Sequence, residues 1–227
     1  MMWHKRATER PILGALIWLA IVVLLCLLHA CGTEPTKAIQ TAGNSFFPLA
    51  VGNRWVFQWD GGDGGQKRAD TVLIDNVAAN GEDAYYHLRC SWPGFEQGRW
   101  IRRMSNGNLT WATHPRGPER QFLLFDVAVG TKWPTGLFEC ADSLSMYEDY
   151  AVVTTPYGRF DGVREIGDVG QCMDAGWGIK LARGVGPVAV SWITIAGPRQ
   201  CLLVDAQVRD DAPTASRAGP KRIVDGK

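Results

Sequence analysis

The sequence predicts an all-β fold: an antiparallel meander that forms an open barrel or a two-sheet sandwich, with an N-terminal signal helix. Apolar and polar side chains alternate with a period of two along most of the chain after residue 53, as they do in half-buried strands. Turn-forming glycine, proline, asparagine and aspartate interrupt this alternation roughly every 8–15 residues, close to the spacing of sandwiches and barrels. Beyond residue 31, no long run has the period of an amphipathic helix.

The first strand is expected where Trp55, Phe57 and Trp59 fall on one face of an extended segment. A hairpin is expected at Asn106-Gly107, because Asn-Gly between two alternating segments is a strong short-range turn signal. Residues 121–127 are apolar on both faces, which predicts a buried strand. The complete set of expected strands is residues 53–59, 71–77, 84–92, 99–104, 109–114, 121–127, 137–144, 147–154, 159–166, 178–182, 188–195 and 201–208.

An export signal is predicted at residues 1–30. A positively charged start precedes a long apolar run that ends in Leu28-His29-Ala30-Cys31. Leu28, Ala30 and Cys31 fit the cleavage motif of bacterial lipoproteins, in which the cysteine thiol accepts a diacylglyceryl group, whereas His29 stands where a small residue is usual. The sequence therefore predicts a lipoprotein precursor anchored at Cys31, with an uncleaved signal anchor and ordinary secretion as the alternatives.

Each alternative places the chain after residue 31 outside the cytoplasm, because the basic start of a signal stays inside. Gly32 follows the lipidation candidate in place of the aspartate that typically holds a lipoprotein in the inner membrane, which favours the outer membrane of a two-membrane bacterium. The expected organisation is a lipoprotein signal peptide (1–30), a flexible tether (31–45), a β domain (46–209) and a disordered tail (210–227).

The charge of the exported part argues against nucleic acid as a partner. The whole chain has 24 Lys and Arg against 23 Asp and Glu, and the two signs are nearly balanced once the basic signal is removed. Nucleic-acid binding needs a clustered basic face, which this balance does not indicate. The expected partners are the membrane, through the lipid anchor, and an envelope protein, a glycan or a lipid ligand.

Four cysteines follow the lipidation candidate Cys31. An even number in an exported domain predicts two disulfides, and four cysteines allow three connectivities. Proximity in the chain favours Cys90–Cys140 and Cys172–Cys201. A reactive thiol would need a base that lowers its pKa. The two histidines that follow the signal, His87 and His114, do not lie in a recognisable Cys/His arrangement.

Three short motifs indicate a family. Phe47-Pro48-Leu49-x-x-Gly52-Asn53-x-Trp55, Thr155-Pro156-Tyr157-Gly158-Arg159-Phe160 and Ala182-Arg183-Gly184-Val185-Gly186-Pro187-Val188 stand in order along the chain. They resemble, in sequence and spacing, the F-P-L-x-x-G-N-x-W start, the T-P-x-G-x-F hairpin and the A-x-G-V-G-x-V segment of a group of uncharacterised bacterial β-rich lipoproteins. The resemblance implies an antiparallel meander curled into an open barrel, and it implies no enzymatic activity.

The candidate ligand surface combines tryptophan with basic residues. Trp100 lies beside Arg102, and Trp111 lies close to Arg116 in the chain. An open barrel could expose these side chains on a concave apolar surface with a basic rim, which would suit a lipid, a glycan or a partner protein. The alternative is that the tryptophans pack in the core, as most aromatic residues of β domains do.

No nucleotide or hydrolase motif is present, so no catalytic residue, metal ligand or cofactor is predicted. Two acidic pairs, Glu139 with Asp142 and Glu148 with Asp149, could serve as an acid/base pair, and the Asp60–Asp63 loop could hold Ca²⁺; exposed strand faces and a solvated loop are the competing interpretations. The leading hypothesis is a non-enzymatic, lipid-anchored binding or assembly module of the cell envelope. The alternatives are a carrier or chaperone for a hydrophobic ligand and a hydrolase with a carboxylate site.

Overall fold

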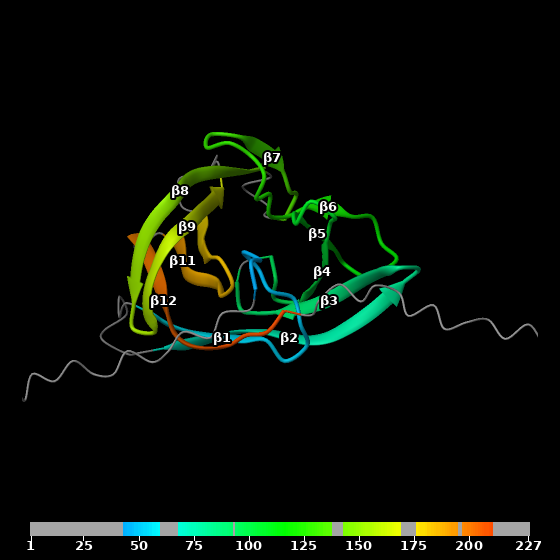
Figure 1. The fold of residues 1–227 in the computed structure, drawn as a ribbon, viewed down its shortest axis with the longest axis horizontal. Helices are drawn as coiled ribbons and strands as arrows, with labels where there is room; N and C mark the ends of the chain where they lie inside the picture. The colour runs from blue at the N-terminus through cyan, green and yellow to red at the C-terminus, as the bar shows by residue number, and fades with distance from the viewer. Residues whose placement is uncertain are drawn as a thin grey trace, which may run out of the picture. The chain divides into compact units, whose positions relative to one another are not determined.

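The computed structural model describes residues 43–59, 68–92, 94–137, 143–168, 176–194 and 197–210. Within these ranges the protein is all-β (Figure 1). The strands are β1 (Arg54–Trp59), β2 (Ala69–Asn80), β3 (Asp83–Arg89), β4 (Arg99–Arg103), β5 (Leu109–Ala112), β6 (Arg120–Gln121), β7 (Lys132–Pro134), β8 (Ser143–Thr155), β9 (Gly158–Asp168), β10 (Gly176–Ala182), β11 (Gly186–Thr194) and β12 (Gly197–Gln207). No helix in this part of the chain is long and apolar enough to cross a membrane.

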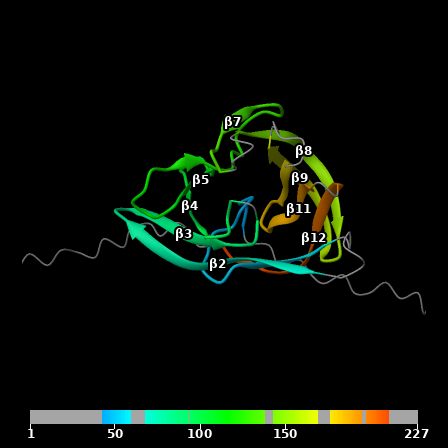
Figure 2. The same cartoon turned by 180° about the vertical axis from the view of Figure 1, so that it is seen from behind.

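The twelve described strands form one antiparallel sheet in the order β6-β5-β4-β3-β2-β1-β12-β11-β10-β9-β8-β7. Strands that are neighbours in sequence are also neighbours in the sheet, apart from β6 and β7, which are not paired. One further pairing joins the first strand to the last, because β1 lies between β2 and β12. The sheet curls until β6 and β7 approach each other, which gives a nearly closed barrel (Figures 1 and 2). The predicted antiparallel meander and its barrel form are confirmed, while the predicted signal helix lies outside the described residues.

Side chains on either side of the β6–β7 gap bridge it with hydrogen bonds. Trp133 in β7 donates its indole Nε1–H to the carbonyl oxygen of Phe122 at 2.9 Å. From the other side, Trp111 in β5 donates to the carbonyl oxygen of Thr135 at 3.0 Å, and all four of these residues are buried or nearly so. Side-chain donors therefore replace, at this seam, the backbone ladder that joins the other neighbouring strands.

Aromatic side chains fill the inside of the barrel. Phe57, Trp92, Phe95 and Phe122 follow one another with ring centroids 6.2, 6.0 and 5.4 Å apart, and Trp92 also contacts Trp177 at 6.1 Å. The first four are at most 1% exposed. Phe57 points inward because side chains alternate along β1, whereas Trp92, Phe95 and Phe122 reach the interior from segments outside the strands. The described interior is therefore a packed core.

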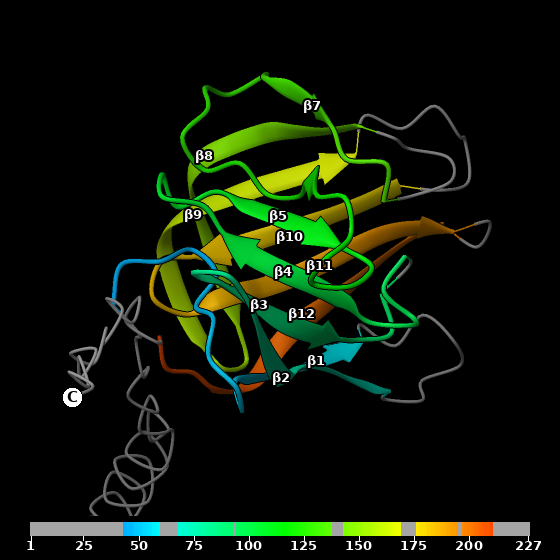
Figure 3. The ribbon, with the colours of Figure 1, turned by 90° about the vertical axis from the view of Figure 1, so that its right-hand side faces the viewer.

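One end of the barrel is covered by the segment that leads into β1. Phe47, Leu49 and Ala50 of this segment are buried, and the segment lies close to the end of β12 and the β10–β11 turn (Figure 3). The side-chain Nδ2 of Asn53 donates to the carbonyl oxygens of Pro48 and Arg209, at 3.0 and 2.7 Å. We call this the capped end; it comprises residues 43–53, 183–185 and 208–210.

Two glycines at the β10–β11 turn adopt a backbone conformation that other residues rarely adopt. Gly184 and Gly186 have φ values of +74° and +97°, a region that favours glycine. The indole of Trp55 is 0% exposed and donates to the carbonyl oxygen of Val185 at 2.7 Å. The turn and the first strand are thereby joined.

The fold departs from the prediction between β5 and β8. The strand expected at residues 121–127 ends at Gln121, so this prediction is wrong beyond that residue. Residues 122–125 are apolar and buried as expected, but they are irregular: the Phe125 amide donates to the side-chain oxygen of Asn108 at 2.7 Å rather than to a strand. The short strand β7 was not expected, and most of the strand predicted at 137–144 lies outside the described residues.

Candidate functional site: a built outer wall

Four side chains of β3 and β4 form two rows on the outside of the barrel. Tyr85 is paired with Arg102 and His87 with Trp100, so the four share one face. Ile101, between the two β4 residues, is 0% exposed and points into the core. We call the outer face of β3 and β4, with the acidic residues that contact it from β2 and from the segment before β6, the outer wall.

Arg102 is held by acidic residues from two other parts of the chain. Its Nε and Nη2 donate to the two carboxylate oxygens of Glu119 at 2.8 and 2.6 Å, a fork that fixes the guanidinium plane. Its Nη1 lies 3.3 Å from a carboxylate oxygen of Asp83, and Tyr85 donates its hydroxyl hydrogen to Glu119. The Arg102 hydrogen bond, against an opposing effect of burial, lowers the pKa of Glu119 to about 2. Burial, followed by the hydrogen bond with Glu119, raises the pKa of Tyr85.

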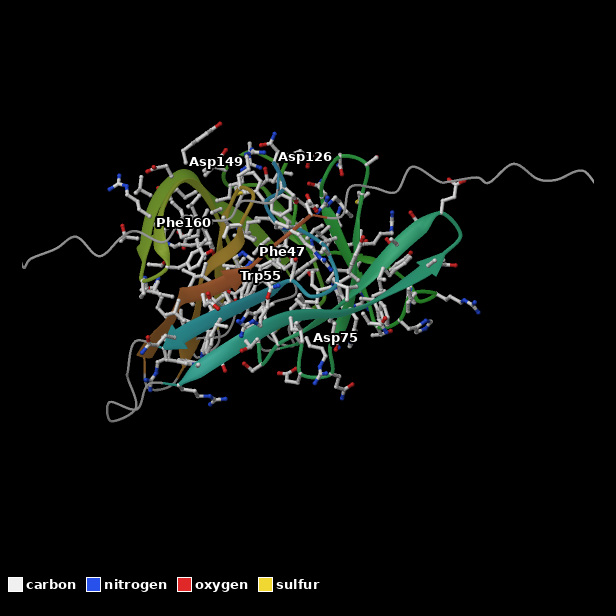
Figure 4. All side chains as sticks on the ribbon, turned by 60° about the horizontal axis from the view of Figure 1, so that its bottom comes forward. Phe47, Trp55, Asp75, Asp126, Asp149 and Phe160 are labelled. Carbon is white, nitrogen blue, oxygen red and sulfur yellow. The ribbon has the colours of Figure 1, made fainter. Side chains whose placement is uncertain are left out.

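A second ion-pair group lies in the neighbouring row. Asp75 of β2 contacts His87 Nδ1 at 2.8 Å and Arg89 Nη1 at 3.2 Å. Burial alone would raise the pKa of Asp75, but its hydrogen bonds with the two basic side chains lower the pKa below its ordinary value. The ring of His87 lies 4.9 Å from that of Trp100, which remains half-buried. Figure 4 shows Asp75 well apart from the interior residues Phe47 and Trp55.

The second ring nitrogen of His87, Nε2, lies against the backbone at Gly98. A Cβ on Gly98 would lie 2.3 Å from Nε2 of the histidine, so only glycine leaves room for the ring in this position. Gly98 also has a φ of +73°. Among the described residues the hydrogen-bond partner of His87 is Asp75. The His–Asp pair is therefore packed against the β3–β4 connection, with its second nitrogen turned toward the chain itself.

The structure brings two of the four sequence-predicted surface residues together. Trp100 and Arg102 share the outer wall. Trp111 is paired with Ile101 and points inward, where it is 6% exposed and where the guanidinium groups of Arg99 and Arg120 lie over its ring. Arg116 is exposed in a turn where its amide donates to Nδ1 of His114 at 3.2 Å. The four residues expected on one concave surface are thus separated: Trp100 and Arg102 lie outside the barrel, Trp111 lies inside it and Arg116 lies in a turn.

The sequence missed Tyr85, His87, Asp75 and Glu119 as members of this site. Alternation in residues 84–92 places Tyr85 and His87 on one face, and this signal could have found them. Glu119 could not be found in this way, because it comes from an irregular segment that reaches Arg102 only after the chain has folded. Asp75 lies at a register shift in the β2–β3 pairing, which the alternation does not reveal.

The other acidic candidates do not form a described acid/base pair. Asp149 forms an ion pair with Arg164 at 2.9 Å, and Glu148 is exposed. Glu139, Asp142, Asp60 and Asp63 lie outside the described residues. Within the described ranges, no group of three or more His, Cys, Asp or Glu could hold a metal ion.

The disulfide candidates are described only in part. Cys90 is half-buried next to the core, and burial raises the pKa of its thiol, which disfavours the reactive thiolate. Cys201 is 1% exposed in β12, where it is paired with Trp59 and Val190. Cys140 and Cys172 lie outside the described residues, as does Cys31, so the disulfide pairing stays a prediction.

The chain matches no family model and no curated protein. Two solved structures resemble it in part. One is a protein from Bacteroides fragilis NCTC 9343, described as exported and as having a YmcC-like fold; it has a TM-score of 0.43 and 12% identity, over 72% of this chain and 99% of that one. The other, from Parabacteroides distasonis ATCC 8503 and described as a lipoprotein, has a TM-score of 0.35 and 11% identity, over 73% and 99% of the two chains. At these values the likeness carries no argument about function, which rests on the residues of this chain.

Proposed function

We propose that the protein is an exported cell-envelope lipoprotein, anchored through Cys31, whose β domain is a non-enzymatic binding or assembly module. The outer wall is the proposed binding surface, and its partner is another component of the envelope, a protein or a glycan. The observation that carries this proposal is the position of Trp100. This large aromatic side chain is half-buried on the outside of the barrel, opposite His87 and on the same strand face as Arg102, and carboxylates hold both of these side chains in place.

Such an arrangement favours binding because its geometry is set before a partner arrives. Aromatic and arginine side chains contribute most to interfaces when they lie at the centre of a patch. Fixing their rotamers in advance lowers the entropy lost on association. The side chains of Arg102 and Glu119 are 20% and 22% exposed, so their pairing is shielded from water more than an ordinary surface ion pair is.

The same geometry favours binding over the hydrolase alternative. A general base must reach the proton that it removes. The Nε2 atom of His87 instead faces Gly98, and the carboxylate of Asp149 is occupied by Arg164. The carrier alternative would need room inside the barrel, and aromatic side chains occupy the described interior.

The anchor is tested by intact-mass analysis of the protein purified from its native membrane, with Cys31→Ser as the control. The expected mass is that of residues 31–227 plus the lipid, and the control should lose the lipid. Retention of residues 1–30 would instead establish a signal-anchored protein. The same spectra, recorded before and after reduction and alkylation, would count the disulfides.

The binding role is tested by placing a photo-activated cross-linking amino acid at Trp100 in cells that express the full chain. The matched control carries the same amino acid at Val129, which is 57% exposed outside the outer wall. Position 100 should give a discrete cross-linked product that position 129 does not give, and Arg102→Ala should weaken it. Identical products from both positions, or none from position 100, would contradict a binding role for the outer wall.

A further inference from the structure

The capped end is the end of the barrel that the proposed anchor would hold at the membrane, so the following inference rests on the proposed lipidation. Twelve residue steps separate Cys31 from Gly43, the first described residue. Whatever its conformation, that length spans at most about 42 Å, and a flexible chain of this length spans about 20 Å on average. Gly43 lies at the capped end, where a Cβ on it would be 3.9 Å from a carboxylate oxygen of Asp210, and the opposite end lies about 30 Å farther away along β11.

Two arginines at the capped end have no carboxylate partner among the described residues. Arg183 is exposed and donates to the carbonyl oxygen of Asn44 at 2.9 Å. Arg209 is exposed and donates to the carbonyl oxygen of Val51 at 2.5 Å. Three other arginines near this end differ from them, because acidic side chains neutralise each one: Arg54 with Asp205, Arg103 with Asp210 and Arg164 with Asp149. Among the described residues 43–53, 183–185 and 208–210, the charge that no side chain of opposite sign neutralises is therefore positive.

The β8–β9 hairpin adds exposed apolar groups to the same end. Its turn lies over β12, where the amide of Tyr157 donates to the carbonyl oxygen of Leu203 at 3.1 Å. On the outer side of the hairpin, Tyr150 is 78% exposed and Val152 is 54% exposed. Tyr150 also has a φ of +72° and lies within irregular β8–β9 pairing, a strained conformation that aims its ring outward.

A line of contacts connects these apolar groups to Arg183. Asp149, the neighbour of Tyr150, binds Arg164. The guanidinium groups of Arg164 and Arg183 both lie over the ring of Phe46, 4.5 and 4.3 Å from its centroid. Phe46 belongs to the segment through which the chain enters from the anchor. The exposed Tyr150 and Val152 thus lie on the same side of the domain as Arg183, close to the segment that leads into β1.

We infer that the capped end is a peripheral membrane-binding surface for anionic phospholipids. Arg183 and Arg209 contact headgroup phosphates, and Tyr150 and Val152 enter the interface between headgroups and acyl chains. Tyrosine is favoured in this interface because its ring is apolar and its hydroxyl is polar. Arginine near an anionic membrane is attracted over about one Debye length, about 8 Å at physiological ionic strength. The lipid anchor supplies the proximity, and the capped end then fixes the orientation, which leaves the outer wall directed along or away from the membrane.

The inference is tested with the lipidated full-length protein in vesicles of zwitterionic lipid, with or without anionic phospholipid. An environment-sensitive fluorophore is attached at Val152→Cys, and the control is attached at Ile193→Cys. Ile193 is 48% exposed near the opposite end of β11. The parent protein, treated with the same reagent, corrects for labelling of native cysteines. In anionic vesicles, the label at 152 should shift its emission to shorter wavelength and resist an aqueous quencher, while the label at 193 should do neither.

Charge removal separates phosphate binding from simple proximity. Arg183→Gln with Arg209→Gln keeps amide donors for Asn44 and Val51 but removes both cations, and it should weaken docking about fivefold per arginine, because each cation contributes about 1 kcal/mol at such a surface. Arg116→Gln, in an exposed turn, should have no effect. Flotation of the same vesicles reports the anchor independently. Protein that floats without a shift at position 152, or with equal shifts at 152 and 193, would overturn this inference alone; protein that does not float would overturn the proposed anchor and this inference with it.

Discussion

The backbone of Gly186 lies directly against the indole ring of Trp55. A Cβ on this glycine would fall 3.0 Å from Cζ2 and Nε1 of the tryptophan, and Gly186 has a φ of +97°. The same indole nitrogen donates to the carbonyl oxygen of Val185 at 2.7 Å. The β10–β11 turn is therefore fitted around the first strand, although the two are far apart in sequence.

Gly186→Ala should reduce the free energy of unfolding by about 2–4 kcal/mol, because it combines positive-φ strain with a contact to a buried ring. The control is Gly197→Ala, since Gly197 has a φ of +104° but nothing within 4 Å of the added carbon. The free energy of unfolding of the control should fall by about 1–2 kcal/mol, because only the positive-φ strain acts there. Urea unfolding followed by tryptophan fluorescence measures both. Equal losses would show that the Trp55 contact is unimportant.

The β6–β7 seam gives a second prediction. Trp111→Phe keeps an aromatic ring in the core but removes the indole hydrogen that Trp111 donates to Thr135 across the gap. The carbonyl oxygen left behind is buried, and its lost hydrogen bond should lower the free energy of unfolding by about 1–3 kcal/mol. Trp100→Phe, on the half-buried outer wall, should change it by less than about 0.5 kcal/mol. A larger loss at position 100 than at 111 would contradict the role assigned to the seam.

The Glu119–Arg102 pair predicts a specific pH dependence. The pKa of Glu119 in the folded protein is about 2, below its ordinary value of 4.5. A group with a lowered pKa stabilises the fold fully above its unfolded pKa and loses that effect as the pH falls toward the folded pKa. Glu119→Gln should therefore be less stable than wild type by on the order of 2–3 kcal/mol at pH 6, and the difference should shrink as the pH falls from about 4.5 toward 2.

Urea unfolding at a series of pH values measures this dependence. The control is Asp161→Asn, which removes a carboxylate from the Arg159 pair, where the two side chains are 72% and 66% exposed. That variant should track wild type across the range, because exposed pairs contribute little. A difference for Glu119→Gln that stays constant with pH would show that the loss is one of packing rather than of the charged pair.

Local patterns predicted most of the strands but not how the ends of the sheet meet. The alternation of Trp55 and Phe57 and the turn at Asn106-Gly107 act over a few residues, so they can be read directly. The closing of the barrel depends instead on Trp111 and Trp133, which donate to carbonyl oxygens across the gap between β6 and β7. Such contacts leave no periodic signal. The irregular residues 122–125 are buried because they lie beside this seam, and burial on both faces resembles a strand in the sequence.

The sequence also could not predict that Trp100 and Trp111 lie on opposite faces of the sheet. The β4–β5 register pairs Trp100 with Ala112 and Ile101 with Trp111. A shift of one residue would have placed both tryptophans on the same face. The five-residue connection between the strands does not fix that register from sequence. Arg102 and Trp100 could be placed together because they are two residues apart on one strand, whereas the acidic residues that hold the wall come from distant segments.

The last described residue connects the end of the β domain to its core. Asp210 receives hydrogen bonds from Arg103 Nη2 at 2.7 Å and from the amide of Leu49 at 3.3 Å, although the sequence placed this residue in the expected tail. Residues 211–227 lie outside the described residues. Arg103 and Asp210 side chains are 25% and 20% exposed, so the pair is partly shielded from water. Asp210 therefore links the segment that leads into β1, through Leu49, to Arg103 of β4.

Asp210→Asn should lower the free energy of unfolding by about 1–2 kcal/mol, because it leaves the guanidinium of Arg103 partly buried without its anion. Asp205→Asn is the matched control, since its pair with Arg54 has side chains 37% and 44% exposed and should contribute less than about 1 kcal/mol. Hydrogen exchange would locate the effect: faster exchange at Leu49 and its neighbours in Asp210→Asn, with no change in β8, is the expected pattern. If the amide of Leu49 exchanged at the wild-type rate, Asp210 would not be needed to hold this segment against β4. The hydrogen bond from Arg103 to the carbonyl oxygen of Phe47, at 3.1 Å, would then suffice, because the substitution leaves it intact.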